Sequence, residues 1–296
     1  MPSLKEVRGR IVSVNSTQQI TKAMKMVAAA KLRRAQDNII KIRPYAEKLA
    51  GILTNISATL DQSIDNIYAS EREVRKVLIV VVTSDRGLAG AFNTNAIKGA
   101  LSLINNEYTS QNQSGNVTIL PIGKKGYDFF NKRGFKVLDT HVGVFLNLSF
   151  DTAKKAAELA MDGFVSGQYD KVVVVYNEFR NVATQVIQRA QFLPIQQETA
   201  LANQSNKLSN VDYIFEPSKE EIVRQLIPKS LKIQFYKAIL ESNASEHGAR
   251  MTAMDKATEN AKELLKDLKL TYNRSRQAAI TKEILEIVGG AEALGG

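Results

Sequence analysis

Apolar residues recur at alternating steps of three and four along residues 4–60, without a break in the spacing. Such a heptad pattern is typical of a helix whose apolar seam packs against a second helix. The seam positions are Leu4, Val7, Ile11, Val14, Gln18, Thr21, Lys25, Ala28, Leu32, Ala35, Ile39, Ile42, Ala46, Leu49, Leu53, Ile56 and Leu60. A helix over this range would be roughly 85 Å long at ~1.5 Å rise per residue. Only Gln18, Thr21 and Lys25 are polar among these positions.

A second seam with the same spacing lies near the other end of the chain. Its positions are Ile233, Tyr236, Leu240, Ala244, His247, Met251, Met254, Thr258, Ala261, Leu265, Leu268, Tyr272, Ser275 and Ala279. Neither helix can bury its seam alone, so the two are predicted to fold back on each other as an antiparallel coiled coil. Pro44 lies inside the first seam and should cost one helical hydrogen bond and bend that helix.

The central part of the chain alternates strand and helix patterns. Strands are predicted at Lys76–Thr83, Val117–Ile122 and Lys171–Tyr176, and helices at Thr94–Ile104, Lys124–Lys132 and Asp151–Val165. Continuous apolar strands of this kind are typical of a parallel sheet buried on both faces. The predicted fold class is therefore α/β, with a long antiparallel coiled coil formed by the N- and C-terminal helices and a central Rossmann-like α/β domain. The predicted domains are residues 1–65, 70–216 and 217–296.

The connecting segments give weaker signals. Val182–Ile195 alternates as an edge strand would, joined to the third strand through a turn at Asn177–Asn181, and Tyr108–Asn116 is predicted to be a polar loop. Further along the chain, the best candidate for a mobile loop is the polar stretch Gln197–Asn210, and a short strand pattern follows at Val211–Phe215. The return helix would be opened by a capping box formed by Ser218 and Glu221, and Pro228 is suited to a fresh helix start.

The net charge of +10 is concentrated at the N-terminal end, where residues 1–60 hold eleven Lys and Arg against three Asp and Glu. We call the cations of this helix the basic collar: Lys22, Lys25, Lys31, Arg33, Arg34, Lys41 and Arg43. Such a collar raises the encounter rate with an acidic protein, nucleic acid or lipid surface. The alternative is a solvated helix face that only aids solubility.

The sequence offers little for bond chemistry. It contains no cysteine, which excludes disulfides, thiol nucleophiles and cysteine metal sites and suggests a reducing compartment. Gly87 and Gly90 follow the first strand without the full dinucleotide-binding spacing, and Gly123 and Gly126 follow the second without the P-loop spacing. Both glycine pairs are interpreted as tight turns. The two histidines and the carboxylates form no cluster with catalytic or metal-binding spacing, so no active site, cofactor or metal is expected.

The C-terminal segment carries an apolar tip formed by Ile280, Ile284, Ile287, Val288 and Leu294. Exposed on a water-soluble rod, such a tip would favour aggregation, so it should be lodged in a partner. The alternative is a frayed helix end that folds over its own neighbour. No apolar run approaches the ~20 residues of a membrane span, and the N-terminus has no signal-peptide core.

Four segments, in the same order, resemble the gamma subunit of F-type ATP synthases. They are Gln19–Lys31, which is similar to the first helix of that family, Thr83–Gly90, which resembles its first βα turn, Ser245–Met254, which resembles the middle of its return helix, and Ile280–Ala291, which resembles its C-terminal signature. The resemblance implies a non-catalytic rotor shaft that couples proton flow to conformational changes in the catalytic subunits. The partners it implies are the alpha and beta subunits, an epsilon subunit and the membrane c-subunit ring, at the cytoplasmic face of a bacterial plasma membrane.

The resemblance also implies partner-binding residues. Arg276 and Gln277, with Thr281 and Glu283 nearby, match the polar catch that hydrogen-bonds a catalytic-subunit loop. Met24 and Lys25 would face the same level from the first helix, and Arg86 would meet the hexamer lower down. Three further residues fall in the foot segment that would rest on the ring: Tyr213, Phe215 and Glu216. The basic collar would then meet acidic loops of the catalytic subunits.

Two other function classes stay open from the residues alone. A nucleotide-dependent α/β enzyme with helical extensions would bind nucleotide saturably as an isolated chain. A basic coiled-coil protein that binds nucleic acid would lose affinity steeply with salt, although the basic residues lie along the paired region and form no separate fork.

Overall fold

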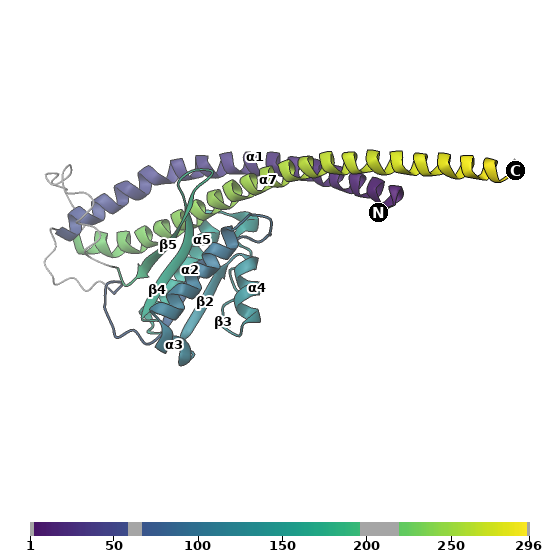
Figure 1. Cartoon of the computed structure of the whole chain (residues 1–296). Helices are drawn as coiled ribbons and strands as arrows, with labels where there is room; N and C mark the ends of the chain where they lie inside the picture. Colours follow the sequence, from purple (N-terminus) through teal and green to yellow (C-terminus); the bar gives the residue numbers. More distant parts are fainter. Residues whose placement is uncertain (1–2, 59–66, 196–218, 295–296) are drawn as a thin grey trace. The chain divides into compact units, whose positions relative to one another are not determined.

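The computed structural model describes residues 3–58, 67–195 and 219–294 (Figure 1). In the sequence, the strands of the central sheet lie between two long helices, α1 (Leu4–Ala58) and α7 (Lys219–Leu294). The chain divides into two compact units, one of residues 1–29 and 250–296 and the other of residues 30–249. The predicted loop, strand and foot contacts in 197–216, and the Ser218 cap, lie outside the described residues.

The larger unit contains a five-stranded sheet with the strand order β3-β2-β1-β4-β5. The strands are β1 (Val77–Val82), β2 (Val117–Ile122), β3 (Lys136–Val137), β4 (Lys171–Phe179) and β5 (Gln185–Leu193). The first four are parallel, and β5 is an antiparallel edge strand next to β4. The chain adds β2 on one side of β1 and β4 on the other, so the crevice between β1 and β4 is the point at which the topology reverses. The predicted parallel sheet and its edge strand are confirmed.

Successive β1 residues point to opposite faces, and each face has its own core. Ile79 and Val81 pack with α2 (Phe92–Asn106) and with Phe130 of α4 (Lys124–Lys132). Leu78 and Val80 pack with α5 (Phe150–Val165) and with α7. Because both faces are covered, every residue of β1 and β2 is buried, which accounts for their unbroken apolar sequence.

The helix α7 is a core element of the larger unit. Its residues Leu231, Phe235 and Ile239 are almost completely buried and belong to the same apolar cluster as α5 and β4. Figure 1 shows this part of α7 passing behind the sheet. The heptad pattern does not predict this second packing face of α7. Burial of α7 from 230 to 249 is nearly continuous around the helix, whereas a two-helix coil buries only one stripe.

The predicted seam of α1 is confirmed. Every seam residue from Leu4 to Leu49 is buried or half-buried, and almost every other described position of α1 is exposed. In the smaller unit the partner is α7: Thr258 donates to Thr21 (2.8 Å), and Lys25 pairs with Asp255 (2.5 Å). Residue numbers rise along α1 as they fall along α7, so the pairing is antiparallel, as predicted.

Three local expectations are wrong. Pro228 does not start a helix, because it lies inside α7. The segment predicted to be a polar loop contains the short helix α3 (Thr109–Gln113). The strand β4 continues through Asn177 to Phe179 before the chain turns, because β5 supplies backbone partners as far as Gln185. The structure also contains β3 and the 3-10 helix η1 (Val144–Asn147), neither of which the pattern predicted.

Tyr108 provides a test of the core beneath α2. Its phenol is buried without a hydrogen-bond partner among the described residues, and burial, with Glu107 nearby, raises its pKa to about 12. The stabilisation of the neutral phenol is therefore complete below pH 10 and is lost as the pH rises through about 12. Tyr108→Phe should leave the free energy of unfolding at pH 7 unchanged or raise it by up to ~1 kcal/mol.

Urea denaturation of the full chain between pH 8 and 12 measures this effect. The Tyr108→Phe variant should lose less stability above pH 10 than the wild type does. Tyr45→Phe, at an exposed position of α1, is the matched control and should change stability by no more than ~0.5 kcal/mol at pH 7. A clear loss of stability in Tyr108→Phe at pH 7 would mean that the hydroxyl has a partner after all.

Candidate functional site

The turn after β1 is closed by its own hydrogen bonds. The Ser84 backbone N–H donates to Asn93 Oδ1 (2.8 Å), and Asn93 Nδ2 donates to Ser84 Oγ (2.8 Å). The N–H of Phe92, the first residue of α2, donates to the Ala89 carbonyl (3.2 Å). In nucleotide-binding α/β proteins, the amides of this turn and helix end bind phosphate. Here these donors are used within the turn.

The N-terminus of α4 is filled in the same way. Three successive backbone N–H groups donate to residues that follow β1: Lys124 to Asp85 Oδ1 (3.0 Å), Lys125 to the Ser84 carbonyl (3.0 Å) and Gly126 to Thr83 Oγ1 (2.8 Å). A helix N-terminus attracts negative charge, and the Asp85 carboxylate provides it. The first three backbone N–H groups of α4 are therefore already bonded within the molecule.

This close contact explains the glycines after β2. Gly123 has φ +104°, and a Cβ atom there would lie 2.1 Å from the Thr83 carbonyl oxygen. At Gly126 a Cβ atom would lie 2.9 Å from Thr83 Oγ1. Both positions need glycine so that the α4 turn can approach β1 closely. The structural interpretation of these glycines is confirmed.

The helix α7 occupies the crevice between the carboxyl ends of β1 and β4. Ser245 Oγ donates to the Asn177 carbonyl (3.0 Å), and Ala249 packs against Ala89 and Phe92. Gly248 lies against the Phe179 ring, so that a Cβ atom would be 3.4 Å from it. Open α/β sheets bind their ligands in this crevice. In this chain a helix of the same molecule fills it.

Other chemistry is equally sparse in the described part of the chain. No group of three or more His, Asp or Glu residues there could hold a metal ion. Burial, aided by Lys155, lowers the pKa of His141, and the hydrogen bond from Lys232 lowers the pKa of the Glu158 carboxyl. At neutral pH these shifts keep His141 uncharged and Glu158 ionised. No described helix is long and apolar enough to cross a membrane.

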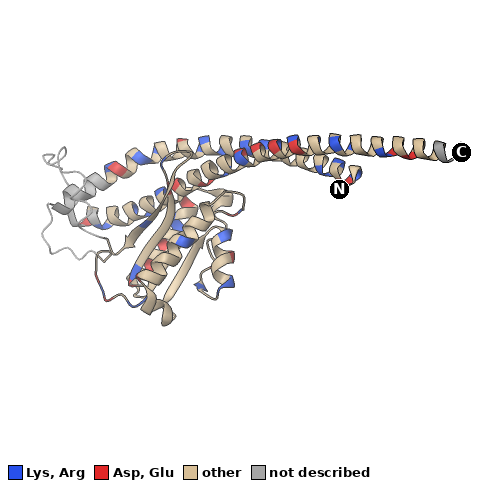
Figure 2. Ribbon diagram, viewed as in Figure 1, with Lys and Arg blue, Asp and Glu red and all other residues tan. Residues whose placement is uncertain are grey.

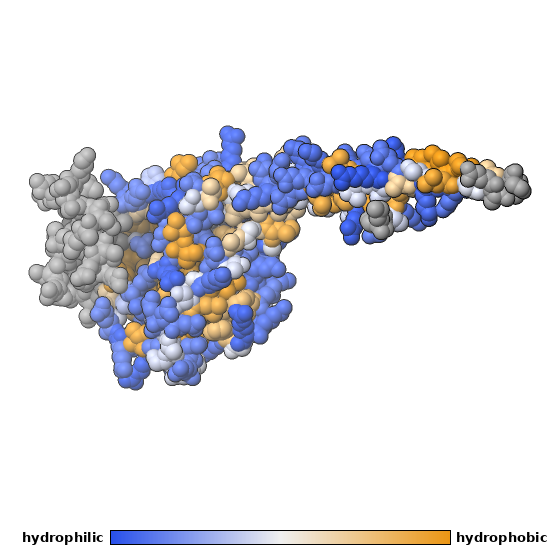
Figure 3. Space-filling model, in the orientation of Figure 1, coloured by the Kyte–Doolittle hydropathy of each residue, from blue (hydrophilic) through white to orange (hydrophobic). Residues whose placement is uncertain are grey.

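The end of α7 is an exposed surface. Residues 276–291 are all exposed, including the predicted catch residues Arg276, Gln277, Thr281 and Glu283. The apolar tip residues Ile280, Ile284, Ile287 and Val288 have between 47% and 67% of their surface exposed. Figure 3 shows the apolar colouring gathered at this end of the helix. The exposure of these four side chains contradicts the alternative that the tip folds over its own neighbour.

The residues predicted on α1 are partly used within the molecule. Met24 is half-buried. Lys25 pairs with Asp255 of α7, and the exposed fraction of the side chain is 40% for Lys25 and 59% for Asp255. In the basic collar, Arg43 pairs with Glu241 (3.0 Å). The other five collar cations are exposed on α1 (Figure 2).

Arg86 is exposed in the turn after β1 and belongs to the larger unit, whereas the other described candidates belong to the smaller one. Close to it, Leu88 has a φ of +64° and is 65% exposed. A leucine in the left-handed region costs of order 1–2 kcal/mol. Leu88 therefore combines a strained backbone with an exposed apolar side chain, which makes it a candidate for contact with another subunit. Residue spacing gives no signal for such a position, so it was not predicted from the sequence.

The comparisons with known proteins agree over the full length. A family model described as ATP synthase matches residues 3–294. The ATP synthase gamma chain of Cytophaga hutchinsonii is 68% identical over 99% of both chains, and that of Flavobacterium psychrophilum is 56% identical over 100% of both.

Two solved structures share the fold. One is a Tetrahymena thermophila mitochondrial ATP synthase central stalk and c-ring chain (26% identity, TM-score 0.54, 80% of this chain and 99% of that one). The other is a chain of the Euglena gracilis mitochondrial ATP synthase, with 22% identity, a TM-score of 0.65 and coverage of 98% of this chain and 94% of that one.

The matches over almost the whole chain define a subunit of ATP synthase. The high identity to gamma chains over almost the whole length then shows which subunit it is: the chain belongs to the ATP synthase gamma-chain family.

The close approach of α4 to β1 can be tested with two alanine substitutions. Gly123→Ala and Gly115→Ala both place a side chain at positive φ, but only Gly123 has atoms within 4 Å of the new Cβ. Gly115→Ala should cost about 1 kcal/mol, and Gly123→Ala should cost at least ~3 kcal/mol, because the backbone at Thr83 must move. Equal losses in thermal denaturation of the two full-chain variants would contradict this account of the turn.

Proposed function

We propose that this chain is the central rotor shaft of a bacterial F-type ATP synthase. Family membership over the whole described length carries this proposal. The shaft couples proton flow through the membrane c-ring to sequential conformational changes in the catalytic subunits. Its partners are the alpha and beta subunits, an epsilon subunit and the c-ring. The chain is peripheral, at the cytoplasmic face of the bacterial plasma membrane.

The chemistry of the α7 tip suits a shaft that turns inside a bearing. Ile280, Ile284, Ile287 and Val288 are spaced i, i+4, i+7 and i+8, so they share one face of the helix. Lys282 and Glu286 form an i,i+4 pair (3.5 Å) on another face. A rotating tip of this kind presents apolar and charged faces in turn to each subunit around it. Rotation therefore changes the contact without any bond chemistry on this chain.

The polar contacts proposed for the shaft follow the resemblance. Arg276, Gln277, Thr281 and Glu283 form the catch on the catalytic subunits. Met24, Lys25 and Arg86 are the other proposed hexamer contacts. Tyr213, Phe215 and Glu216 are the proposed foot on the ring, and they lie outside the described residues. We also propose three domains for this shaft: the N-terminal coiled-coil helix (residues 1–65), the central α/β domain (70–216) and the C-terminal return helix (217–296).

The basic collar would meet acidic loops of the catalytic subunits. Its exposed cations are Lys22, Lys31, Arg33, Arg34 and Lys41. Attraction between exposed charges is screened within about 10 Å at 0.1 M salt, so these contacts are weak and can slide. The nucleotide-dependent enzyme has no observation in its favour, because the crevice it would need is filled by α7.

The catch is tested by Arg276→Ala in the complete complex reconstituted into proteoliposomes. ATP synthesis should fall about tenfold or more, because a charge-assisted hydrogen bond contributes roughly 1.5–3 kcal/mol. Arg75→Ala is the matched control, since Arg75 is an exposed arginine that pairs with the neighbouring Glu73 (2.6 Å), and it should leave synthesis unchanged. ATP-driven proton pumping at the full rate by a complex lacking this chain would overturn the rotor function itself.

A further inference from the structure

The strand β4 extends beyond its neighbour β1. The last paired residues of the two strands are Val81 and Val175, whereas β4 continues to Phe179. On its other edge β4 is paired with β5 along this extension. The edge toward β1 would therefore be left without backbone partners from Asn177 onward.

Two side chains of α7 take the place of the missing strand. Ser245 Oγ donates to the Asn177 carbonyl (3.0 Å), and the Phe179 N–H donates to Glu241 Oε2 (3.2 Å). A carbonyl and the N–H two residues further on are the pair of groups that one residue of a parallel neighbour would bond. Glu241 and Ser245 are spaced i and i+4, so they reach this edge from one face of the helix.

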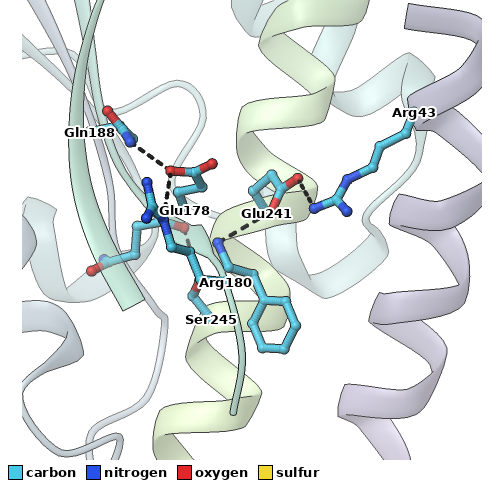
Figure 4. A network of polar contacts seen from close by, with 8 residues as sticks. Arg43, Glu178, Arg180, Gln188, Glu241 and Ser245 are labelled. Atoms are coloured by element: carbon cyan, nitrogen blue, oxygen red, sulfur yellow. Dashed lines mark hydrogen bonds and ion pairs between the residues drawn. The ribbon is translucent and has the colours of Figure 1, made fainter. Parts of the chain in front are cut away.

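Glu241 also binds α1. Its Oε1 accepts from Arg43 Nη2 at 3.0 Å, and its side chain is only 4% exposed while that of Arg43 is 45% exposed. One buried carboxylate therefore bonds the end of β4 and α1 at the same time (Figure 4). We call Arg43, Glu241, Ser245 and their backbone partners on β4 the Glu241 joint.

The strand end held by the joint is itself fixed on its other side. Gln188 of β5 donates to Glu178 Oε2 (2.6 Å), and Arg180 lies 3.9 Å from the same carboxylate. The adjacent buried Asn177 donates from Nδ2 to the Phe92 carbonyl (3.5 Å). The joint therefore connects the two long helices to a part of the sheet that is held from both edges.

We infer that the Glu241 joint bears the torque between the α/β sheet and the two long helices, with Glu241 and Arg43 as positioning residues. This inference rests on the proposed rotor function. Apolar contacts such as those of Phe235 and Ile239 are non-directional and resist sliding or twisting weakly. Hydrogen bonds are directional, and those to a charged group are the stronger ones. Helix α7 therefore cannot turn or slide against β4 without breaking bonds of this kind.

Stability alone gives no reason for this buried charge. A buried ion pair is often no more stabilising than apolar residues of the same volume, whereas it does fix one arrangement among several. Next to the joint, Ala249 of α7 packs against Ala89 and Phe92. A directional, charged contact at this point suits a role in holding a defined angle and height.

The experiment uses Glu241→Gln, Arg43→Gln and Arg43→Lys in the complete complex in proteoliposomes. Glu241→Gln and Arg43→Gln should lower the number of protons pumped per ATP hydrolysed by roughly twofold or more, because each loses a charge-assisted bond. ATP hydrolysis should continue. Arg43→Lys retains the cation and should restore most of the ratio. Arg75→Gln, at an exposed pair outside the joint, should pump as the wild type does.

Amide exchange of Phe179 checks that the joint has been broken, and it should rise about tenfold in Glu241→Gln. If Glu241→Gln fails to assemble, Arg43→Gln decides the question, because that side chain is nearly half exposed. Wild-type proton-to-ATP ratios in an assembled Arg43→Gln complex, or no rescue by Arg43→Lys, would overturn the joint. Full pumping by a complex without this chain would instead overturn the rotor function.

Discussion

Helix α7 lies across the carboxyl ends of β1 and β4, and much of the molecule depends on its burial there. Its apolar residues complete the core on one face of the sheet, and Ser245, Gly248 and Ala249 fill the crevice where open α/β sheets bind ligands. The turns after β1 and β2 also bond to each other, because the first three amides of α4 donate to residues 83–85. The same packing that builds the α/β unit therefore also fills the crevice at the ends of β1 and β4.

The chain separates two kinds of contact along α7. Between residues 230 and 249 the helix is buried, and polar side chains such as Glu241 and Ser245 bond specific backbone groups. From residue 276 onward all described side chains are exposed, and apolar residues remain in water within the isolated chain. Fixed, directional bonds suit a joint that must not slip, and a surface without internal partners suits one that must move against other subunits.

The candidate site was only partly accessible to sequence reasoning. The proposed catch and the exposed tip on α7 could be named from the sequence, because the catch residues match a family signature and because apolar residues without an internal partner stand out in a helix pattern. The seam placed Lys25 toward the second helix, but the ion-pair partners of Lys25 and Arg43 could not be predicted, because only the position of α7 supplies Asp255 and Glu241. Leu88 was missed because backbone strain leaves no mark on residue spacing.

Local patterns by themselves determined the seam of α1 as far as Leu49 and that of α7 as far as Ser275, whereas Ala279, the last predicted seam residue, is exposed. They also determined the limits of β2 and α4 and the lack of a complete nucleotide-binding motif in the sequence. These features follow from the period of burial and from turn chemistry, which act over a few residues. The tertiary structure alone decided that Pro228 lies within α7, that β4 runs to Phe179, and that α7 belongs to the sheet core as well as to the coil. Each of these depends on a partner far away in sequence, and a heptad pattern specifies one packing face while a second partner can bury the others.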